Sequence, residues 1–163
     1  GADMFDLTQD VCGAAGMPAY EVSNHARDSA QSRHNLIYWR YGDYLGIGPG
    51  AHGRLTLGGA RNATICFSNP KRWLDEVASN NAEQSRETLT RDDAATEFLL
   101  MGLRLREGID VTRYAALAGK PLDAGAVAHL ANIGMITTTS GTLTVTDQGF
   151  RVLNSVISEL LTA

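Results

Sequence analysis

The densest group of chemically capable side chains lies in residues 33–54, RHNLIYWRYGDYLGIGPGAHGR. Its first part places an imidazole (His34), an amide (Asn35), a phenol (Tyr38) and an indole (Trp39) close together. An imidazole can ligate iron, and tyrosine and tryptophan offer flat apolar faces with a polar group attached. This cluster suits a flat aromatic ligand that carries a metal. The alternative is a His-capped turn followed by a partly buried aromatic strand.

The second part of the stretch, GDYLGIGPGAHG at 42–53, has the glycine content of a phosphate-binding loop. It lacks both the Gly-Lys-Ser/Thr ending and the G-x-G-x-x-G spacing that lead into a helix in such loops. Pro49 and the glycines are instead typical of a tight turn whose backbone approaches a ligand or another chain segment closely. On the pattern alone, turn geometry and ligand contact both stay open.

A few other side chains are weaker candidates. His25 and His52 could line the same cleft, and Glu21 is a carboxylate in a predicted strand, where it needs a cleft or an arginine partner. Cys12 and Cys66 are far apart in sequence and cannot form a three- or four-cysteine metal motif. We expect both to be small buried residues of a protein in a reducing compartment.

Composition excludes several classes of protein. The formal net charge is −4, with 14 Lys and Arg against 18 Asp and Glu, and neither half of the chain is basic. A nucleic-acid partner is therefore not expected, because phosphate binding needs clustered cations. No apolar run approaches the roughly 20 residues that cross a bilayer, so no transmembrane segment is expected. These features indicate a soluble, cytoplasmic protein.

The elements that must position the cluster follow from periodicity. Residues 80–88 are polar and aperiodic, which predicts a boundary between two domains, 1–80 and 81–163. In the first, the pattern predicts a helix at 5–15, a strand at 18–23, a polar loop at 24–36, short strands and turns at 37–61, and a helix at 70–79 N-capped by Asn69.

The second domain reads as mostly helical. Thr90 and Asp93 form an acidic variant of the capping box at the start of a helix that Gly108 ends, and a short helix closes at Gly119. A further helix at 121–133 turns Leu122, Ala126, Leu130 and Ile133 inward, a hairpin surrounds Ser140-Gly141, and a last helix begins at its N-cap, Asp147.

This order of helices and a hairpin is typical of a winged-helix-like module. Winged helices often bind DNA, but the helix at 121–133 has no Lys or Arg and the hairpin TTTSGTLT is uncharged. A DNA-binding surface needs several cations against phosphates. We therefore expect this module to pack against its own protein or a protein partner.

Five segments, in order, resemble one known family: YEVSNHA, SRHNLIYWRYGDYLGIGPGAHGR, NPKRWLDEV, EFLLMGLRLREGID and the ending LANIGMITTTSGTLTVTDQGFRVLNSVISELL. Together they are similar to the C-terminal part of oxygen-independent coproporphyrinogen III oxidase-like radical SAM proteins, over residues 10–161. The H-N-x-x-Y-W element resembles the heme chaperone branch of that family. The resemblance implies an α+β chain: the end of a radical SAM (β/α) barrel, then a winged-helix-like domain with a β-hairpin.

The resemblance also implies site residues. His34, Asn35, Tyr38 and Trp39 match the family's proposed heme-binding motif, with His34 as the candidate iron ligand and Tyr38 as the alternative. Intact family members bind S-adenosylmethionine and a [4Fe–4S] cluster held by a CxxxCxxC loop, which this sequence lacks. On this resemblance, the turn formed by Gly46, Gly48, Gly50, Ala51 and His52 abuts the S-adenosylmethionine site.

The function that this implies is heme binding for delivery to respiratory-chain acceptor proteins. Two alternatives stay open: part of a coproporphyrinogen III oxidase, or a protein-interaction module without a ligand. The sequence begins without Met and looks like a piece of a longer protein, which by itself lacks the cluster motif and should be inactive. We expect the strand in PAYEVS to lack sheet neighbours and to favour self-association.

Overall fold

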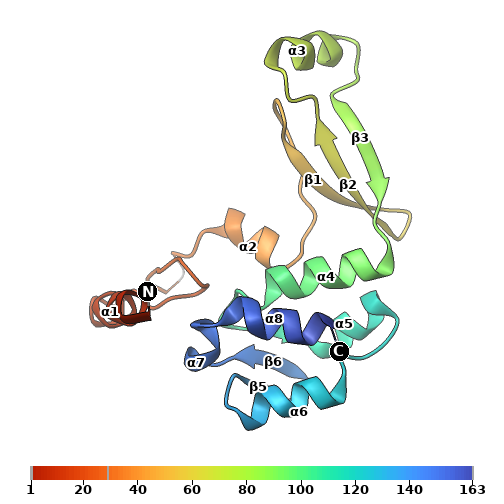
Figure 1. Ribbon diagram of the computed structural model, residues 1–163. Helices are drawn as coiled ribbons and strands as arrows, with labels where there is room; N and C mark the ends of the chain where they lie inside the picture. Colours follow the sequence, from red (N-terminus) through yellow and green to blue (C-terminus); the bar gives the residue numbers. More distant parts are fainter. Residues whose placement is uncertain (1, 29, 163) are drawn as a thin grey trace.

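The N-terminal third of the chain contains helices joined by irregular backbone. In a computed structural model, which describes residues 2–28 and 30–162, helix α1 spans Ala2–Ala14 and helix α2 spans Arg33–Trp39 (Figure 1). The strand predicted at 18–23 is wrong, because that backbone makes only isolated bridges, Ala19 with His25 and Glu21 with Leu105. Two isolated bridges do not make a strand, because a strand needs a continuous ladder of hydrogen bonds to a neighbouring strand.

Helix α2 corrects a second prediction. The loop predicted at 24–36 and the strands and turns predicted at 37–61 are wrong over Arg33–Trp39, where the backbone is helical, whereas the strand over His52–Leu57 and the one that starts at Ala60 confirm the later part. The Ser32 side chain caps the helix by accepting from the Asn35 N–H at 3.3 Å. Beyond its end, the Tyr41 and Gly42 N–H groups donate back to the carbonyls of Tyr38 (2.9 Å) and Ile37 (2.8 Å). These two bonds form a Schellman motif, with Tyr41 at φ 56°.

A three-stranded antiparallel sheet stands away from the helical part of the molecule (Figure 1). Its order is β1 (His52–Leu57), β2 (Ala60–Cys66) and β3 (Glu83–Thr88), and the glycine pair 58–59 turns β1 into β2 with positive φ at both residues. Helix α3 (Pro70–Ala78), capped by Asn69 as predicted, covers the far end of the sheet.

Strand β3 lies within the segment that was predicted as an aperiodic boundary. It pairs with β2 along the outer edge of the sheet, and most of its side chains are exposed. An exposed edge strand can carry a polar sequence, which is why periodicity did not reveal it. The division into 1–80 and 81–163 stays a prediction, and the β2–β3 pairing crosses it.

The second half begins with helix α4 (Arg91–Gly102), where the predicted capping box of Thr90 and Asp93 is present. The helix ends at Gly102, so the end predicted at Gly108 is wrong. A Cβ at Gly102 would lie 2.3 Å from a methyl carbon of Ile109, so the chain that follows folds directly back over the helix end. Gly108 has φ +73° and belongs to the turn after it.

The remaining elements form a helical layer over a small antiparallel sheet of order β4-β6-β5. They are β4 (Ile109–Asp110), α5 (Val111–Ala118), α6 (Ala124–Asn132), β5 (Ile136–Thr139), β6 (Thr142–Val145), α7 (Asp147–Phe150) and α8 (Leu153–Thr162). The hairpin and the close of α5 at Gly119 are confirmed. The last helix is interrupted, and its N-cap is Thr146, whose hydroxyl accepts from Gly149, instead of Asp147.

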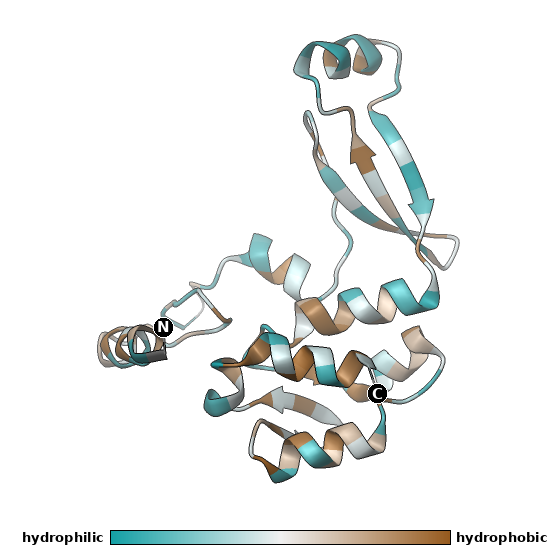
Figure 2. Ribbon diagram, in the orientation of Figure 1, coloured by the Kyte–Doolittle hydropathy of each residue, from teal (hydrophilic) through white to brown (hydrophobic). Residues whose placement is uncertain are grey.

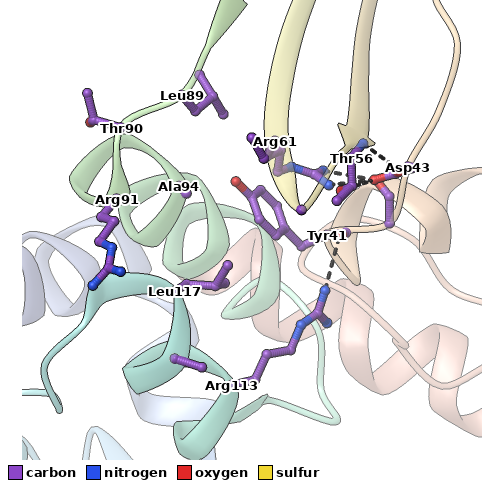
Figure 3. A pocket seen from close by; sticks show the side chains of 14 residues that line it. Tyr41, Asp43, Thr56, Arg61, Leu89, Thr90, Arg91, Ala94, Arg113 and Leu117 are labelled. Atoms are coloured by element: carbon purple, nitrogen blue, oxygen red, sulfur yellow. Dashed lines mark hydrogen bonds and ion pairs between the residues drawn. The ribbon is translucent and has the colours of Figure 1, made fainter.

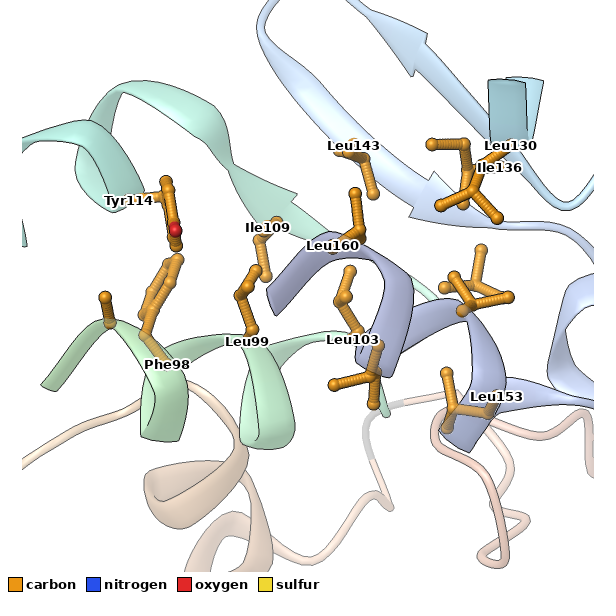
Figure 4. Close-up of a cluster of buried hydrophobic side chains, with 14 of the residues drawn as sticks. Phe98, Leu99, Leu103, Ile109, Tyr114, Leu130, Ile136, Leu143, Leu153 and Leu160 are labelled. Carbon is orange, nitrogen blue, oxygen red and sulfur yellow. The ribbon is translucent and has the colours of Figure 1, made fainter. Parts of the chain in front are cut away.

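The main hydrophobic core lies between α4, α8 and this small sheet (Figure 4). Leu99, Leu103 and Leu143 are fully buried in it, whereas Ile133 is 44% exposed, which corrects its predicted inward position. Ile133 is the C-cap of α6, and the chain turns away there at Gly134 (φ 74°). The apolar faces of α4 and α8 meet inside the domain (Figure 2). The expected mixture of helix and sheet is confirmed.

Candidate functional site

The HNLIYW segment is held in place by contacts from three parts of the chain. On its inner side, Leu36 is buried against Tyr20 and Leu105. At its C-terminal end, the Arg113 guanidinium donates to the carbonyls of Arg40 (2.9 Å) and Tyr41 (3.1 Å). Cations stabilise the C-terminal carbonyls of helices. Helix α2 is therefore fixed to the C-terminal domain at its end.

A salt bridge adds to this anchor. Arg40 donates to both carboxylate oxygens of Glu107, at 2.7 and 2.8 Å, and this pairing lowers the pKa of Glu107. The side chains of both partners are about half exposed, at 51% and 50%. Exposed pairs contribute at most about 1 kcal/mol, so this one orients the helix more than it stabilises the fold.

The opposite face of α2 presents the imidazole and the phenol together. His34 and Tyr38 are one helical turn apart, and the Tyr38 hydroxyl lies 2.7 Å from Nε2 of His34. Their rings also meet edge to face, with centroids 4.7 Å apart. His34 is exposed, so the pair stands on the surface of the molecule. The helix thus brings together two of the four residues predicted for the heme site.

This hydrogen bond sets what the imidazole can offer to a metal. When Nε2 carries the proton and donates it to the phenol oxygen, the lone pair of Nδ1 is left for a ligand. A hydrogen bond to the far nitrogen is also how metal-binding histidines are oriented. No hydrogen bond within the described residues occupies Nδ1 of His34. The pair therefore provides an oriented imidazole with Tyr38 behind it.

Trp39 occupies a different side of the helix. The Trp39 indole packs against the small cluster around Tyr20, and the Arg104 guanidinium lies 5.4 Å above its ring. Its Nε1 is buried without a hydrogen-bond partner within the described chain. Trp39 comes five positions after His34, about 140° around the helix, so it does not share a face with His34. The helix thus separates Trp39 from the surface pair, and Asn35, which is partly exposed, donates its backbone N–H to Ser32.

An aromatic contact extends the His34–Tyr38 pair toward the glycine-rich turn. The ring of Tyr44 packs edge to face on Tyr38, with centroids 4.5 Å apart, and burial raises the pKa of its phenol. Beside it, Arg54 of β1 donates to the Glu97 carboxylate of α4, at 2.6 Å from Nη2. Sequence reasoning missed Tyr44 and this ion pair, since only the fold brings residues 54 and 97 together.

The glycine-rich turn is a closely packed connection. Tyr44 pairs with Arg54 through reciprocal backbone hydrogen bonds, and the Cys66 thiol donates to the Gly46 carbonyl at 3.4 Å. A Cβ at Gly46 would lie 2.6 Å from the carbonyl carbon of His52. Gly48 and Gly50 have φ of 119° and 69°, a region that favours glycine. Turn geometry alone therefore accounts for these glycines.

The same turn exposes two large apolar side chains. Leu45 is 68% exposed and Ile47 is 81% exposed, directly after Tyr44. His52 is exposed at the start of β1, and Ala51 donates to the Gly48 carbonyl at 3.2 Å. No hydrogen bond or ring contact in the described ranges joins His34 to His52 or His25. The turn is thus a backbone unit with an apolar outer surface, separate from the imidazole.

Glu21 and His25 lie in the irregular segment before α2. Glu21 is fully buried, and its Oε1 accepts from the N–H of Ser23 at 3.0 Å and from its hydroxyl at 3.3 Å. Glu21 Oε2 and His25 Nδ1 are buried without partners among the residues described. The arginine partner considered for Glu21 is not found there, so both groups stay unexplained by this fold.

The chain cannot supply a cluster site of the radical SAM kind. It has two cysteines, and both are free thiols in the structure: Cys66 is buried and Cys12 is partly exposed. Three thiolates are needed, so the residues present do not fit a [4Fe–4S] cluster. Within residues 2–28 and 30–162, no group of three His, Cys, Asp or Glu side chains could hold a metal ion, and no helix is long and apolar enough to cross a membrane.

The chain is similar to proteins that are named as heme chaperones or as radical S-adenosyl methionine proteins. Residues 89–152 match the family described as HemN C-terminal domain. The chain is 30% identical over 164 residues to the heme chaperone HemW of Bacillus subtilis, covering 98% of this chain and 42% of that protein. It is 42% identical over 113 residues to mitochondrial radical S-adenosyl methionine domain-containing protein 1 of Bos taurus, covering 66% of this chain and 26% of that protein. The chain thus spans less than half the length of these relatives.

A solved structure shares the fold. Coproporphyrinogen III oxidase (HemN) from Escherichia coli, described as a radical SAM enzyme, superposes with a TM-score of 0.67 at 18% identity, over 98% of this chain and 40% of that one. HemW of Escherichia coli is also 30% identical, over 98% of this chain. The chain therefore carries the HemN C-terminal domain over residues 89–152 and has HemW heme chaperones and radical S-adenosyl methionine domain-containing protein 1 among its homologues.

Proposed function

We propose that this chain is the heme-holding part of a heme chaperone, and that His34 offers its imidazole to the heme iron. Heme is the cargo in this proposal. The observation that carries it is the exposed, hydrogen-bonded pair of His34 and Tyr38, in which Nε2 lies 2.7 Å from the phenol oxygen. A surface imidazole oriented from behind fits a protein that must take up a ligand and also release it.

The surroundings of the pair suit a flat apolar molecule. Tyr38 and Tyr44 stack edge to face, and Leu45 and Ile47 lie exposed immediately beyond Tyr44. Monomeric proteins leave large apolar side chains exposed in groups chiefly where something binds. We propose that these side chains contact the porphyrin face or its edge. Trp39 supports the helix from within, Asn35 supports its N-terminal end, and their role is to position the pair.

The homologues favour the chaperone over the oxidase. Relatives at 30% identity over 98% of this chain are named heme chaperones, whereas the oxidase neighbour, at 18% identity, supports the fold alone. We propose that the heme goes on to acceptor proteins of the respiratory chain. The two free cysteines suit a reducing compartment, and we propose the cytoplasm.

For the glycine-rich turn we propose contact with S-adenosylmethionine in the intact radical SAM protein. The support is Gly48, whose φ is 119° and beside which a Cβ would meet nothing within 4 Å, so that its backbone is open to a ligand. Amide chemical shifts of residues 46–52 should move on addition of S-adenosylhomocysteine to a full-length protein. Shifts confined to other residues would contradict this role.

Heme titration of the chain tests the main proposal. The change in Soret absorption gives the Kd for the unaltered chain and for His34→Ala, Tyr38→Phe and the matched control His129→Ala, whose imidazole is exposed on α6. We expect His34→Ala to weaken binding at least about tenfold, Tyr38→Phe to weaken it less, and His129→Ala to have no effect. Equal affinity of the His34→Ala variant and the control would overturn the assignment of His34.

A further inference from the structure

A pocket of about 570 Å³ lies where the first sheet meets the C-terminal domain (Figure 3). Its walls come from the segment after α2, the turn between β1 and β2, the start of α4 and one side of α5. This volume is in the range of small-molecule sites. The pocket reaches Gly42 and Asp43, but neither His34 nor residues 44–53 line it, so it is separate from the site proposed above.

The pocket gathers cations in a chain whose net charge is −4. Its lining includes the guanidinium groups of Arg61, Arg91 and Arg113, against a single carboxylate, that of Asp43. Asp43 is committed to Arg61, which donates to it at 2.8 Å and lies beneath the surface with a side chain that is 9% exposed. The Asp43 carboxylate also accepts from the N–H (2.7 Å) and hydroxyl (2.9 Å) of Thr56. These bonds help to lower its pKa, so it stays charged.

The other two arginines have no carboxylate partner within 4.0 Å among the residues that the structure describes. The Arg113 guanidinium donates to two backbone carbonyls, those of Arg40 and Tyr41. Its other N–H donors remain available to a ligand. Arg91, at the first position of α4, makes no side-chain hydrogen bond within the described residues and lies over Gly119 at the end of α5. The pocket therefore holds two arginines without a direct carboxylate partner, although backbone hydrogen bonds, and then the charge of Arg113, lower the pKa of nearby Asp110.

The remaining walls are apolar. The ring of Tyr41 and the side chains of Leu89, Ala94 and Leu117 also line the pocket (Figure 3). A carboxylate or phosphate group would find charge-assisted donors at Arg91 and Arg113, and a hydrocarbon part would find the apolar wall. Both arginines sit on helices of the domain, and the carbonyls of Arg40 and Tyr41 hold the Arg113 guanidinium in place.

We propose that this pocket binds a small organic anion, a carboxylate or phosphate with an apolar body, through Arg91 and Arg113. The proposal does not rest on heme binding at His34. Two probes with the same apolar body separate the possible head groups: phenyl phosphate and 3-phenylpropionate. Each is titrated into the 163-residue chain while the arginine Nε–H signals are followed by NMR, with heme absent.

Saturable shifts of the Arg91 and Arg113 signals support the proposal, and the tighter of the two probes identifies the head group. Arg91→Gln should weaken that probe about tenfold, because it removes a charge-assisted hydrogen-bond donor. Arg86→Gln on β3, whose arginine is exposed and lies outside the pocket, is the charge-matched control and should bind unchanged. Because Arg91 is exposed and unpaired within the described chain, its replacement should leave the melting temperature unaltered.

Two results would overturn the proposal. One is that neither probe gives a saturable shift. The other is that the shifts are equal at Arg86 and at the pocket arginines, which would mean general attraction to positive charge. Failure of heme binding in the titration above would not contradict the proposal for this pocket, so the two proposals can fail separately.

Discussion

Removal of the Tyr41 hydroxyl should stabilise the protein. Tyr41 is 4% exposed, and its buried hydroxyl oxygen makes no well-formed hydrogen bond within the described residues, although the Glu97 carboxylate is close enough to add to the effect of burial in raising its pKa. Burial of an unpaired hydroxyl costs about 1–3 kcal/mol. The two ring contacts survive in phenylalanine: Arg61 lies 3.7 Å above the ring, and Phe98 meets it with centroids 5.8 Å apart. We therefore expect Tyr41→Phe to raise the free energy of unfolding by about 1 kcal/mol.

Alkaline pH should enlarge this difference. Burial raises the pKa of the Tyr41 phenol from 10.0 to about 12, with Arg61 opposing the shift. Between these two values the unfolded chain releases the phenol proton while the folded chain keeps it, so the stability that this tyrosine contributes is lost as pH rises. The loss is about 1 kcal/mol near pH 11, at about 1.4 kcal/mol per pH unit of differential ionisation. Phenylalanine has no such loss.

Urea unfolding gives the free energy of unfolding of both proteins at neutral pH and near pH 11, and thermal unfolding gives their melting temperatures. We expect the melting temperature of Tyr41→Phe to be higher by about 2–4 °C at neutral pH, the usual value per kcal/mol for a chain of this size. The gap should be wider at high pH. Destabilisation by Tyr41→Phe at neutral pH would show that the hydroxyl makes a favourable hydrogen bond, and the reasoning from its burial would be wrong.

Other substitutions test the packing. Leu99→Ala, at a fully buried position in the main core, should lower the free energy of unfolding by about 2–5 kcal/mol in chemical denaturation. Gly108→Ala should destabilise by more than about 1 kcal/mol, because φ is +73° and a Cβ would lie 2.2 Å from the Leu143 carbonyl oxygen; an unchanged melting temperature would refute that contact. A double-mutant cycle of Arg54→Gln and Glu97→Gln should give a coupling of about 1–2 kcal/mol, and additive effects would mean that the pair is not formed.

Several helix ends and a hairpin turn could be predicted from the sequence, because residues within a few positions of one another determine them. Asn69 and Thr90 cap their helices through their own side chains, and Gly119 and the Ser140-Gly141 turn adopt positive φ as their positions require. Periodicity and cap residues therefore predicted them.

Helix α2 could not be predicted in the same way. The segment Arg33–Trp39 ends in isoleucine, tyrosine and tryptophan, which favour a strand by composition, and its helical state depends on Ser32 at one end and on Arg113 at the other. Arg113 lies more than 70 residues away in sequence. Once the helix is known, the spacing of His34 and Tyr38 explains their contact, but Tyr44 and Glu97 enter the site only through the fold.

Resonance Raman spectroscopy of ferrous heme bound to the chain tests the central claim most directly, because it detects an iron–histidine bond. We expect an iron–imidazole stretching band in the unaltered chain and in His129→Ala, and its loss in His34→Ala. Tyr38→Phe should keep the band at a shifted frequency, since the hydrogen bond behind the imidazole is removed. The same band, unshifted, in His34→Ala would show that another residue holds the iron and would contradict the claim.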